Sequence, residues 1–333
     1  MKAVFFEVTD KEKEYISANL PETENVFVAE KINEENAATI REAKIISVFV
    51  GHDVTGAVMD ALPNLSLIAA RSTGFDHIDL EHARAKNIAV ANVPAYGSRT
   101  VAEFTFGLML TLSRKIFSAR RQMLESEDFS MEKLEGFDLK DKTLGVVGTG
   151  RIGRNVIKIA RAFEMNVLAA DIKPDENFAA EAGFQYMPLE ELLKNSDIIS
   201  LHAPYLPETK HLINSDNIQL MKKGAYLINT ARGELVETDA LLKALTTGQL
   251  AGAGLDVLES ERQLKEEAEL LTYQPGQIKD FKTLSEDHIL INMPQVVVTP
   301  HIAFCTAQAR EEIIKTTVEN IKSFLAATPQ NLV

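Results

Sequence analysis

Three side chains that could bind an anion or transfer a proton, Arg232, Glu261 and His301, each follow a short apolar run that predicts a strand. Ligands of open parallel sheets bind beyond the carboxyl ends of the strands, so these side chains are candidates for one site. A guanidinium can hold a carboxylate through two parallel hydrogen bonds, and an imidazole exchanges protons near neutral pH. Taken singly, each residue also has an ordinary structural explanation: a solvated arginine, a charged turn and a histidine that caps a strand.

A glycine-rich turn lies earlier in the chain, in the context that a dinucleotide site requires. An apolar run over 144–147 leads into Gly148, Gly150 and Gly153 at the spacing G-x-G-x-x-G, and a helical pattern follows. These glycines allow a tight turn, a close approach of the backbone to a pyrophosphate, and close packing of helix on strand. A second predicted strand ends at Asp171, 18 residues beyond Gly153, close to the roughly 20 expected for the acidic residue that binds the ribose.

Asp171 favours NAD over NADP, because a carboxylate accepts hydrogen bonds from ribose hydroxyls and repels a 2′-phosphate. Lys173 lies close enough to weaken that preference. The alternative is a glycine turn without a ligand. The strand, the helix and the aspartate in register favour the dinucleotide site.

Short apolar runs alternate with segments of helical period over most of the chain, which predicts parallel sheets covered by helices on both faces. The predicted strands are 3–6, 45–50, 67–70, 89–91, 144–147, 166–170, 198–201, 225–229, 254–257 and 296–299. Crossover helices are expected between them, for example at 190–194 and 238–247.

A helix predicted over 101–115 marks a domain boundary. Thr100 and Glu103 have the spacing of a capping box, and apolar residues follow at helical intervals. Gly107 lies inside this helix at some cost relative to alanine, which suggests close packing against another element.

A terminal amphipathic helix, predicted over 311–326, returns the chain to its first part. We therefore expect one discontinuous domain of residues 1–100 and 300–333. A central domain of residues 101–299 contains the glycine turn. Two domains suit a chain of 333 residues.

The composition is acidic and poor in cysteine. Lys and Arg number 35 against 48 Asp and Glu, a net charge of −13, which disfavours nucleic acid and anionic membranes as partners. One cysteine, Cys305, excludes a disulfide framework, and no metal-binding motif occurs, so no metal is predicted. The chain opens without a signal-peptide pattern, and its longest uncharged stretch, 289–309, contains two prolines, so a cytoplasmic protein is expected.

Three ordered segments carry a resemblance to a known family: 228–233, 254–261 and 297–301. Together with the glycine turn, they resemble the D-isomer-specific 2-hydroxyacid dehydrogenases, and within them most closely the fermentative D-lactate dehydrogenases. The resemblance spans essentially the whole chain. It implies an α/β fold with a Rossmann dinucleotide-binding domain inserted in a flavodoxin-like substrate domain, with NAD as the cofactor.

The resemblance also implies roles for the polar residues after the strands. Arg232 would bind the carboxylate and carbonyl oxygen of a 2-keto acid, and His301 would act as general acid in reduction and general base in oxidation. Glu261 would hydrogen-bond His301 and favour its protonated form. Asp256 would support the nicotinamide side of the site.

Further contacts follow from the same resemblance. The cofactor-binding residues implied are Gly148, Gly150, Arg151, Ile152, Gly153, Asp171, His202, Pro204, Thr209, Thr230, Ala231 and Asp256. The substrate-binding residues implied are Thr73, Gly74, Tyr96, Phe49 and Phe304. Plain turns, loops and core packing explain several of these positions nearly as well, notably His202, Thr209, Tyr96 and the two phenylalanines.

The expected function is the NAD-dependent reduction of a small 2-keto acid to the D-2-hydroxy acid, with pyruvate to D-lactate preferred. One alternative is another keto acid (hydroxypyruvate, glyoxylate, phenylpyruvate or 2-ketoisocaproate), and the other is an NAD-sensing transcriptional regulator of the same fold. The long segment 262–295 resembles the lactate branch and favours a small substrate. Cys305 stands where many lactate-type members carry tyrosine.

Two expectations concern assembly and motion. A homodimer is implied by the resemblance, with the helix at 101–112 and the arm after it as the contact, because a helix that is apolar on most sides needs partners. Closure of the domains is expected to expel water from the site, with hinges near 95–100 and 300–303.

Overall fold

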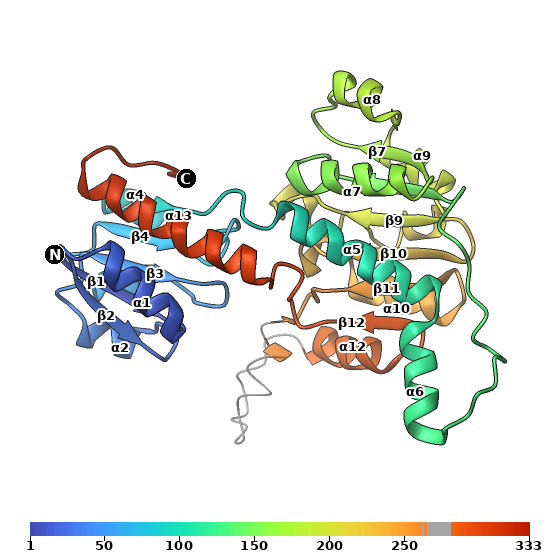
Figure 1. The fold of residues 1–333 in the computed structure, drawn as a ribbon, viewed down its shortest axis with the longest axis horizontal. Coiled ribbons are helices and arrows are strands. Elements are labelled where there is room, and N and C mark those ends of the chain that lie inside the picture. The colour runs from blue at the N-terminus through green and yellow to red at the C-terminus, as the bar shows by residue number, and fades with distance from the viewer. Residues whose placement is uncertain (262, 265–280) are drawn as a thin grey trace. The chain divides into compact units, whose positions relative to one another are not determined.

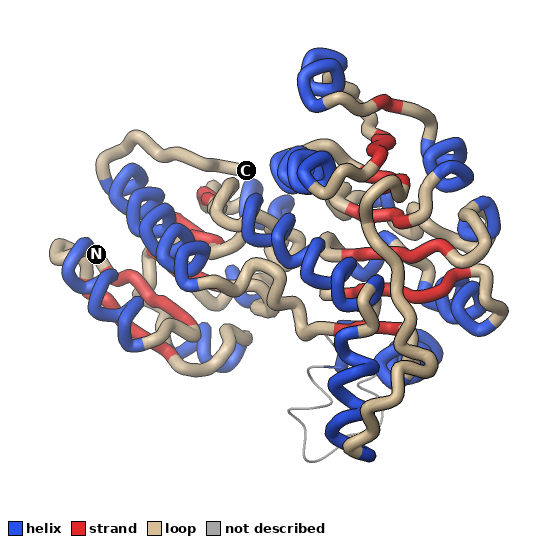
Figure 2. Tube along the Cα trace, turned by 45° about the vertical axis from the view of Figure 1, so that its right-hand side comes forward, coloured by secondary structure: helices blue, strands red, loops and turns tan. Residues whose placement is uncertain are grey.

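The structure is a computed structural model that describes residues 1–261, 263–264 and 281–333. The chain forms two compact units. Unit 1 comprises Met1–Tyr96 and Thr306–Val333, and unit 2 comprises Gly97–Cys305. Figures 1 and 2 show that each unit is a sheet with helices on both faces.

Unit 1 is built on a five-stranded parallel sheet. Its strands are β1 (Lys2–Phe6), β2 (Glu24–Val28), β3 (Ile45–Val48), β4 (Leu67–Ala70) and β5 (Ala89–Ala91). Their order is β2-β1-β3-β4-β5, the flavodoxin-like order, and every pairing is parallel. Strands β1, β3 and β4 are almost wholly buried because helices cover both faces.

The helices of unit 1 divide between the two faces of its sheet. Helices α1 (Asp10–Asn19) and α13 (Ala307–Leu325) pack on one face, where Ile314, Val318 and Ile321 of α13 meet Phe5 and Ile45. Helices α2 (Glu34–Thr39), α3 (Gly56–Asp60) and α4 (Leu80–Ala85) cover the other face. The last residues return to the sheet edge, where the amide of Val333 donates to the carbonyl of Val90 at 3.0 Å.

Unit 2 is built on a seven-stranded parallel sheet. Its strands are β6 (Thr143–Val147), β7 (Asn166–Ala170), β8 (Gln185–Tyr186), β9 (Ile198–Leu201), β10 (Ala225–Asn229), β11 (Leu250–Leu255) and β12 (Val296–Val298). The order β12-β11-β10-β9-β6-β7-β8 is the Rossmann order with one additional strand. The chain proceeds outward in one direction from β6 and in the other from β9, so the topological switch point lies between these two strands.

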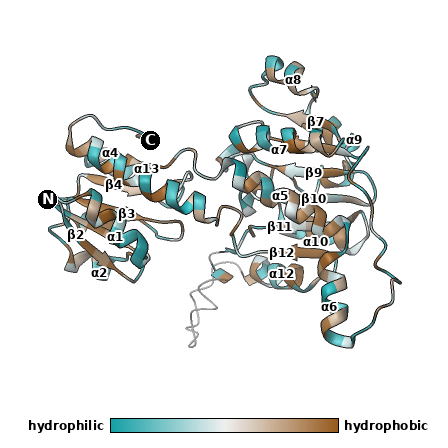
Figure 3. Cartoon of the chain, viewed as in Figure 1, coloured by the Kyte–Doolittle hydropathy of each residue, from teal (hydrophilic) through white to brown (hydrophobic). Residues whose placement is uncertain are grey.

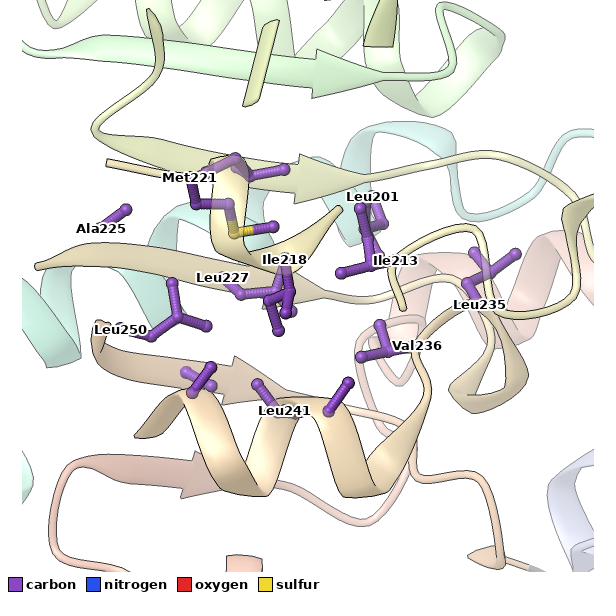
Figure 4. Packing of buried hydrophobic residues seen from close by; sticks show 14 of the residues in the cluster. Leu201, Ile213, Ile218, Met221, Ala225, Leu227, Leu235, Val236, Leu241 and Leu250 are labelled. Carbon is purple, nitrogen blue, oxygen red and sulfur yellow. The ribbon is translucent and has the colours of Figure 1, made fainter. Parts of the chain in front are cut away.

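Two apolar clusters fill the space between this sheet and its helices. Helices α5 (Ser98–Ser113) and α7 (Arg151–Ala162) cover one face, with α8 (Glu176–Ala182) at its end. Helices α9 (Leu189–Asn195), α10 (Thr238–Thr246) and α12 (Phe281–Asn292) cover the other face. Figure 4 shows Ile218, Leu227 and Leu241 meeting in the layer between β10 and α10. Outside both clusters, α6 (Ile116–Ser126) contributes no buried residue.

The α/β class, the parallel sheets and the two fold types expected from the sequence are confirmed. The prediction missed the edge strands β2 and β8, each of which pairs with a single neighbour. β2 is partly exposed along its length and β8 has two residues, so neither carries a buried apolar run. Strand β11 begins at Leu250, four residues before the predicted start. The prediction missed this part because residues 251–253 are alanine and glycine, which are depleted in strands.

Two predictions for the helix at 101–115 are wrong. The helix begins at Ser98 with Gly97 as its N-cap, so Thr100 lies inside it, and Glu103 pairs with Arg99 at 2.7 Å rather than closing a capping box. Gly107 faces open space in the described chain, since no atom lies within 4 Å of the position that its Cβ would take. The close approach occurs at Gly254 instead, where an added Cβ would lie 3.1 Å from the Cβ of Leu108.

Helix α12 carries a carboxyl group into the interior of unit 2. Asp287 is 0% exposed, and its Oδ2 accepts a hydrogen bond from the amide of Ser260 at 2.9 Å. Its Oδ1 is buried without a hydrogen-bond partner in the described part of the chain. Burial raises the pKa of Asp287 to about 7, and the carboxylates of Glu259 and Glu286 act in the same direction.

We expect Asp287→Asn to stabilise the protein, by an amount that grows as the pH rises. An acid whose pKa is raised by folding binds its proton more tightly in the folded state. The wild type therefore loses stability as the pH rises from 3.8, the pKa of an unperturbed aspartic acid, towards about 7. Asparagine cannot ionise, so the variant escapes that loss. Calorimetry should show a Tm advantage that widens up to about pH 7 and then stays constant at roughly 5 °C.

The matched control is Glu286→Gln, which removes the neighbouring carboxylate on the same helix and leaves the bond to Ser260 in place. A Tm difference between wild type and Asp287→Asn that does not change with pH would contradict this reading of the buried carboxyl group.

Candidate active site

The glycine turn after β6 lies at the switch point of the unit 2 sheet. Gly148 has a φ of +93°, and an added Cβ there would lie 2.7 Å from the carbonyl carbon of His202, so the loops after β6 and β9 are in backbone contact. A Cβ on Gly153 would lie 2.0 Å from the carbonyl oxygen of Gly148. Both positions therefore require glycine. Gly150, by contrast, faces open space in the described chain, as a backbone approached by a ligand must.

Helix α7 begins directly after this turn with Gly150 as its N-cap. In the described part of the chain the N-cap, a glycine, makes no side-chain bond to the first amides, and the first turn contains no acidic residue. The amides at a helix N-terminus carry partial positive charge and bind phosphate when no side chain occupies them. Of the neighbouring residues, Arg151 is exposed, and Ile152 packs on the apolar cluster beneath the helix.

Asp171 follows β7 beside the glycine turn. Its Oδ2 accepts hydrogen bonds from the amide of Thr149 at 2.6 Å and from the Thr149 hydroxyl at 2.9 Å, and its Oδ1 accepts from the amide of Lys173 at 2.8 Å. Partial burial raises the pKa of Asp171, but these hydrogen bonds outweigh it and the net pKa is lowered. The carboxylate is therefore ionised at neutral pH and fixed at the end of the strand.

His202 follows β9 on the other side of the switch point. Its Nε2 lies 2.8 Å from the hydroxyl of Ser200, and its Nδ1 is buried without a hydrogen-bond partner among the described residues. Burial lowers the pKa of His202 to about 3, so the ring is neutral. Thr209 closes a turn onto the carbonyl of Pro204 at 2.7 Å.

These features fit a dinucleotide. The uncapped helix start and the open backbone at Gly150 suit a pyrophosphate, the ionised Asp171 suits ribose hydroxyls, and the unpartnered Nδ1 of His202 suits a polar group of a ligand. Thr230 and Ala231 lie in the next loop, where the Thr230 hydroxyl contacts that of Thr105 at 3.0 Å.

His301 and Glu261 are in direct contact. The ring Nδ1 of His301 lies 2.9 Å and 3.1 Å from the two carboxylate oxygens of Glu261. An ionised carboxylate can only accept, so Nδ1 carries the proton of this bond and Nε2 remains for exchange with another molecule. His301 has a φ of +55°, an uncommon backbone conformation for a residue with a side chain.

Asp256 holds His301 in that conformation. Its Oδ1 accepts from the Thr299 hydroxyl at 2.5 Å and the Ile302 amide at 3.0 Å, and its Oδ2 accepts from the Ala303 amide at 2.8 Å. Burial raises its pKa, although these hydrogen bonds oppose the rise. The structure therefore directs the Asp256 carboxylate to the histidine turn, while the nicotinamide role expected for it stays a prediction.

Arg232 lies in the loop after β10, which Asn229 shapes. The Asn229 side chain accepts from the Ala231 amide at 3.0 Å and donates to the Arg232 carbonyl at 2.7 Å. The next residue, Gly233, touches the turn that carries Glu261, because an added Cβ would lie 2.1 Å from the carbonyl group of Leu258. The loops bearing Arg232 and Glu261 are thus in backbone contact at one edge of the sheet.

The residues expected to bind substrate divide between the units. In unit 1 the Thr73 hydroxyl donates to the carbonyl of Val93 at 2.8 Å, and Gly74 follows in the same turn. Phe49 and Tyr96 are half-buried in unit 1. In unit 2 the ring of Phe304 lies edge-on to that of His301, with 6.3 Å between centroids.

Cys305 is exposed next to Phe304. The segment 262–295, expected to favour a small substrate, falls in part outside the described residues.

Sequence reasoning missed the residues that shape these turns. The Thr299 hydroxyl donates to the Asp256 carboxylate beside the His301 turn, and the Asn229 side chain donates to the carbonyl of Arg232. A polar residue at the end of an apolar strand is the available signal for both, because buried polar groups are almost always hydrogen-bonded. No described helix has the length and apolar character needed to cross a membrane.

Comparison with known proteins gives one family. Residues 106–303 match the family described as "D-isomer specific 2-hydroxyacid dehydrogenase, NAD binding domain". The D-lactate dehydrogenase of Escherichia coli is 36% identical over 88% of this chain and 86% of its own length. The glyoxylate reductase of Thermofilum pendens is 37% identical over 88% of this chain and 81% of its own length.

The comparison with solved structures leads to the same family. The crystal structure of D-lactate dehydrogenase from Aquifex aeolicus, complexed with NAD and lactic acid, superposes with a TM-score of 0.86. The two chains are 38% identical, and the match covers 98% of this chain and 96% of that one.

Proposed function

Because this chain belongs to the D-isomer specific 2-hydroxyacid dehydrogenase family, we propose that it reduces a small 2-keto acid, with pyruvate preferred, to the D-2-hydroxy acid. It is an NAD-dependent enzyme. The observation that carries the proposal is the bond between Glu261 and Nδ1 of His301, beside the loop of Arg232 and on the sheet that bears the glycine turn.

Reduction of a 2-keto acid needs a hydride, a proton and a cation for the substrate carboxylate. NADH, held by the residues of the glycine turn, would supply the hydride for the carbonyl carbon. His301 donates the proton from Nε2 to the carbonyl oxygen, and Glu261 stabilises the positive charge of the ring before transfer. The planar guanidinium of Arg232 holds the carboxylate and the carbonyl oxygen. In the oxidation direction His301 takes the proton back.

The assignments for the cofactor follow the features of unit 2. Gly148, Gly150 and Gly153 with the start of α7 hold the pyrophosphate, and Asp171 holds the ribose. The remaining proposed contacts are Arg151, Ile152, His202, Pro204, Thr209, Thr230, Ala231 and Asp256.

The substrate assignments rest on resemblance and side-chain chemistry. The backbone amides of Thr73 and Gly74 bind the carboxylate, and Tyr96 donates a hydrogen bond to it. The resemblance assigns Phe49 of unit 1 and Phe304 of unit 2 to contact with the substrate side chain, and two aromatic residues in that role favour a small acid. Relatives of similar identity carry the names D-lactate dehydrogenase and glyoxylate reductase, so both pyruvate and glyoxylate belong in any substrate panel.

We propose a cytoplasmic location, because the chain has a single cysteine and that residue is an exposed free thiol, which suits a reducing compartment.

One prediction concerns the reaction itself. NADH oxidation, followed by its absorbance, should be fastest with pyruvate among pyruvate, glyoxylate, hydroxypyruvate, phenylpyruvate and 2-ketoisocaproate, and the product should be the D-enantiomer. His301→Gln keeps a ring-sized polar side chain without a titratable nitrogen, so kcat should fall by about 10²–10⁴-fold while NADH still binds.

His82→Gln is the control, since His82 bonds Asp60 on the surface of unit 1. Wild-type turnover in His301→Gln would refute the role of His301, and no NADH oxidation with any acid of the panel by the wild type would refute the proposed reaction.

Another prediction concerns the choice between NADH and NADPH. Asp171→Ala removes the negative charge that repels a 2′-phosphate, so kcat/KM with NADPH relative to NADH should rise about ten-fold or more. Glu176→Ala removes an exposed carboxylate at the start of α8 and should leave the ratio unchanged. An unchanged ratio in Asp171→Ala would contradict the assignment of the ribose contact.

We also propose a homodimer, with α6 and the residues after it as the contact. Helix α5 is largely covered within unit 2, whereas α6 exposes Phe117 and Leu124 at 53% and 66%, and Phe129 beyond it is 86% exposed. Figure 3 shows hydrophobic residues along α6. Apolar side chains exposed together in this way favour a protein partner.

Light scattering should give a mass near twice the 36.8 kDa of one chain. The double variant Phe117→Glu, Leu124→Glu should shift that mass to one chain, because charged side chains cannot be buried in the contact without a partner. Ile289→Glu, an exposed apolar position on α12, is the control. A monomeric wild type would refute the homodimer, and an unchanged mass of the double variant would refute this contact.

A further inference from the structure

The turn at residues 258–261 carries Glu261, and its own backbone bonds do little to hold it. The amide of Glu261 donates to the carbonyl of Leu258 at 3.2 Å, which closes the turn. The next described bond runs from the amide of Leu264 to the carbonyl of Ser260 at 3.0 Å. Among the described residues, further contacts with the rest of unit 2 are made by Glu259 and Ser260 of this turn, and they help to fix the position of Glu261.

Glu259 ties the turn to two other segments. Its Oε1 lies 2.6 Å from Nε2 of His211, and its Oε2 accepts from the hydroxyl and the amide of Thr238 at 2.8 Å and 3.3 Å. Thr238 is the first residue of α10, so the carboxylate also satisfies an amide at the start of that helix. The Glu259 side chain is 17% exposed, which strengthens these bonds relative to a surface pair.

The carboxyl group of Asp287, on α12, holds the next residue of the turn, Ser260. Its Oδ2 accepts from the amide of Ser260, which lies between Glu259 and Glu261 in the chain. Both residues of this bond are buried, at 0% and 7% exposure. Leaving a buried amide without an acceptor is costly, so the turn would move if the Ser260 amide lost Asp287.

The same contacts reach the loop of Arg232. Gly233 packs directly on the carbonyl of Leu258 and the amide of Glu259, and the amide of His211 donates to the carbonyl of Glu234 at 2.8 Å. His211 therefore bonds the turn through its ring and the arginine loop through its backbone. A displacement of the turn would therefore move Glu261, which bonds His301, together with Arg232, which is proposed to bind the substrate.

We infer that Glu259 and Asp287 are positioning residues of the reaction, which hold Glu261 within hydrogen-bond reach of His301 and keep its turn in register with the Arg232 loop. This inference rests on the proposed function for the reaction it serves. Neither residue needs to touch substrate or cofactor. They act through the backbone of residues 258–261.

The titratable groups around Asp287 are compatible with its role as hydrogen-bond acceptor for Ser260. The raised pKa of Asp287 leaves part of its population protonated near neutral pH, and Oδ2 accepts from Ser260 in either form. The titratable side chains that face Asp287 are Glu259 from the turn, and Glu286 and His288 from its own helix. On the adjacent α10, Asp239 is paired with Lys243 and Lys282.

The main experiment compares Asp287→Leu with Asp287→Asn. Leucine is close in size and removes the acceptor for the Ser260 amide, whereas asparagine keeps an acceptor oxygen and serves as the conservative rescue. With NADH and the best keto acid, Asp287→Leu should lower kcat about ten-fold, since small misplacements of catalytic groups cost up to 10²-fold, and KM should rise as well because the Arg232 loop moves with the turn. Asp287→Asn should recover most of the loss.

Glu286→Gln is the matched control on the same helix and should keep wild-type kcat. If Asp287→Leu does not fold, a second variant decides the test. Thr238→Val removes the hydroxyl donor to Glu259 at constant size and should lower kcat about three-fold. If Asp287→Leu folds, a kcat within two-fold of the wild-type value overturns the inference. If it does not fold, the same result in Thr238→Val overturns it.

A readout without substrate separates this inference from the proposed function. The Nδ1 proton of His301, bonded to Glu261, should give a low-field proton resonance, assigned by its absence in His301→Gln. Other histidine–carboxylate pairs, such as that of His52 and Glu7, keep theirs in this variant. The resonance should weaken in Asp287→Leu and persist in Glu286→Gln, even if the wild type reduces no keto acid. An unchanged resonance in Asp287→Leu overturns the inference.

Discussion

The hydrogen bond between Glu261 and Nδ1 of His301 is the interaction on which the proposed chemistry of this enzyme depends. It leaves Nε2 as the ring nitrogen that can exchange a proton with another molecule. The two residues lie 40 positions apart in the chain. Their contact therefore exists only if the loops after β11 and β12 are both held in place, and most polar residues around them serve that purpose.

Each of these loops is held by a buried carboxylate. The Asp256 carboxylate accepts three hydrogen bonds from residues 299–303, and these bonds keep His301 in its left-handed backbone conformation. Asp287 accepts the amide beside Glu261. Burial raises the pKa of both carboxyl groups, so the arrangement costs stability as the pH rises. Such a cost is typical of sites where geometry matters more than stability.

Glycine provides the other constraint, because several loops approach more closely than a side chain permits. Gly148 brings the loop after β6 onto that after β9 at the switch point, and Gly233 brings the arginine loop onto the glutamate turn. Gly254 lets α5 lie against β11. Gly107 shows the converse, since sequence reasoning assigned it a close contact that the described chain does not have. A glycine in a sequence indicates freedom of the backbone without saying what approaches it.

The sequence by itself determined the layered α/β fold, the place of the glycine turn and the residue types that follow the strands, because buried parallel strands and helix starts have strong local patterns. It did not reveal the edge strands β2 and β8, the true start of α5, or the bracing of the Glu261 turn by Glu259 and Asp287. These features depend on which surfaces meet after folding. A carboxylate such as Asp287 has the same local pattern on an exposed helix as in the interior, and only tertiary packing decides its partners and its pKa.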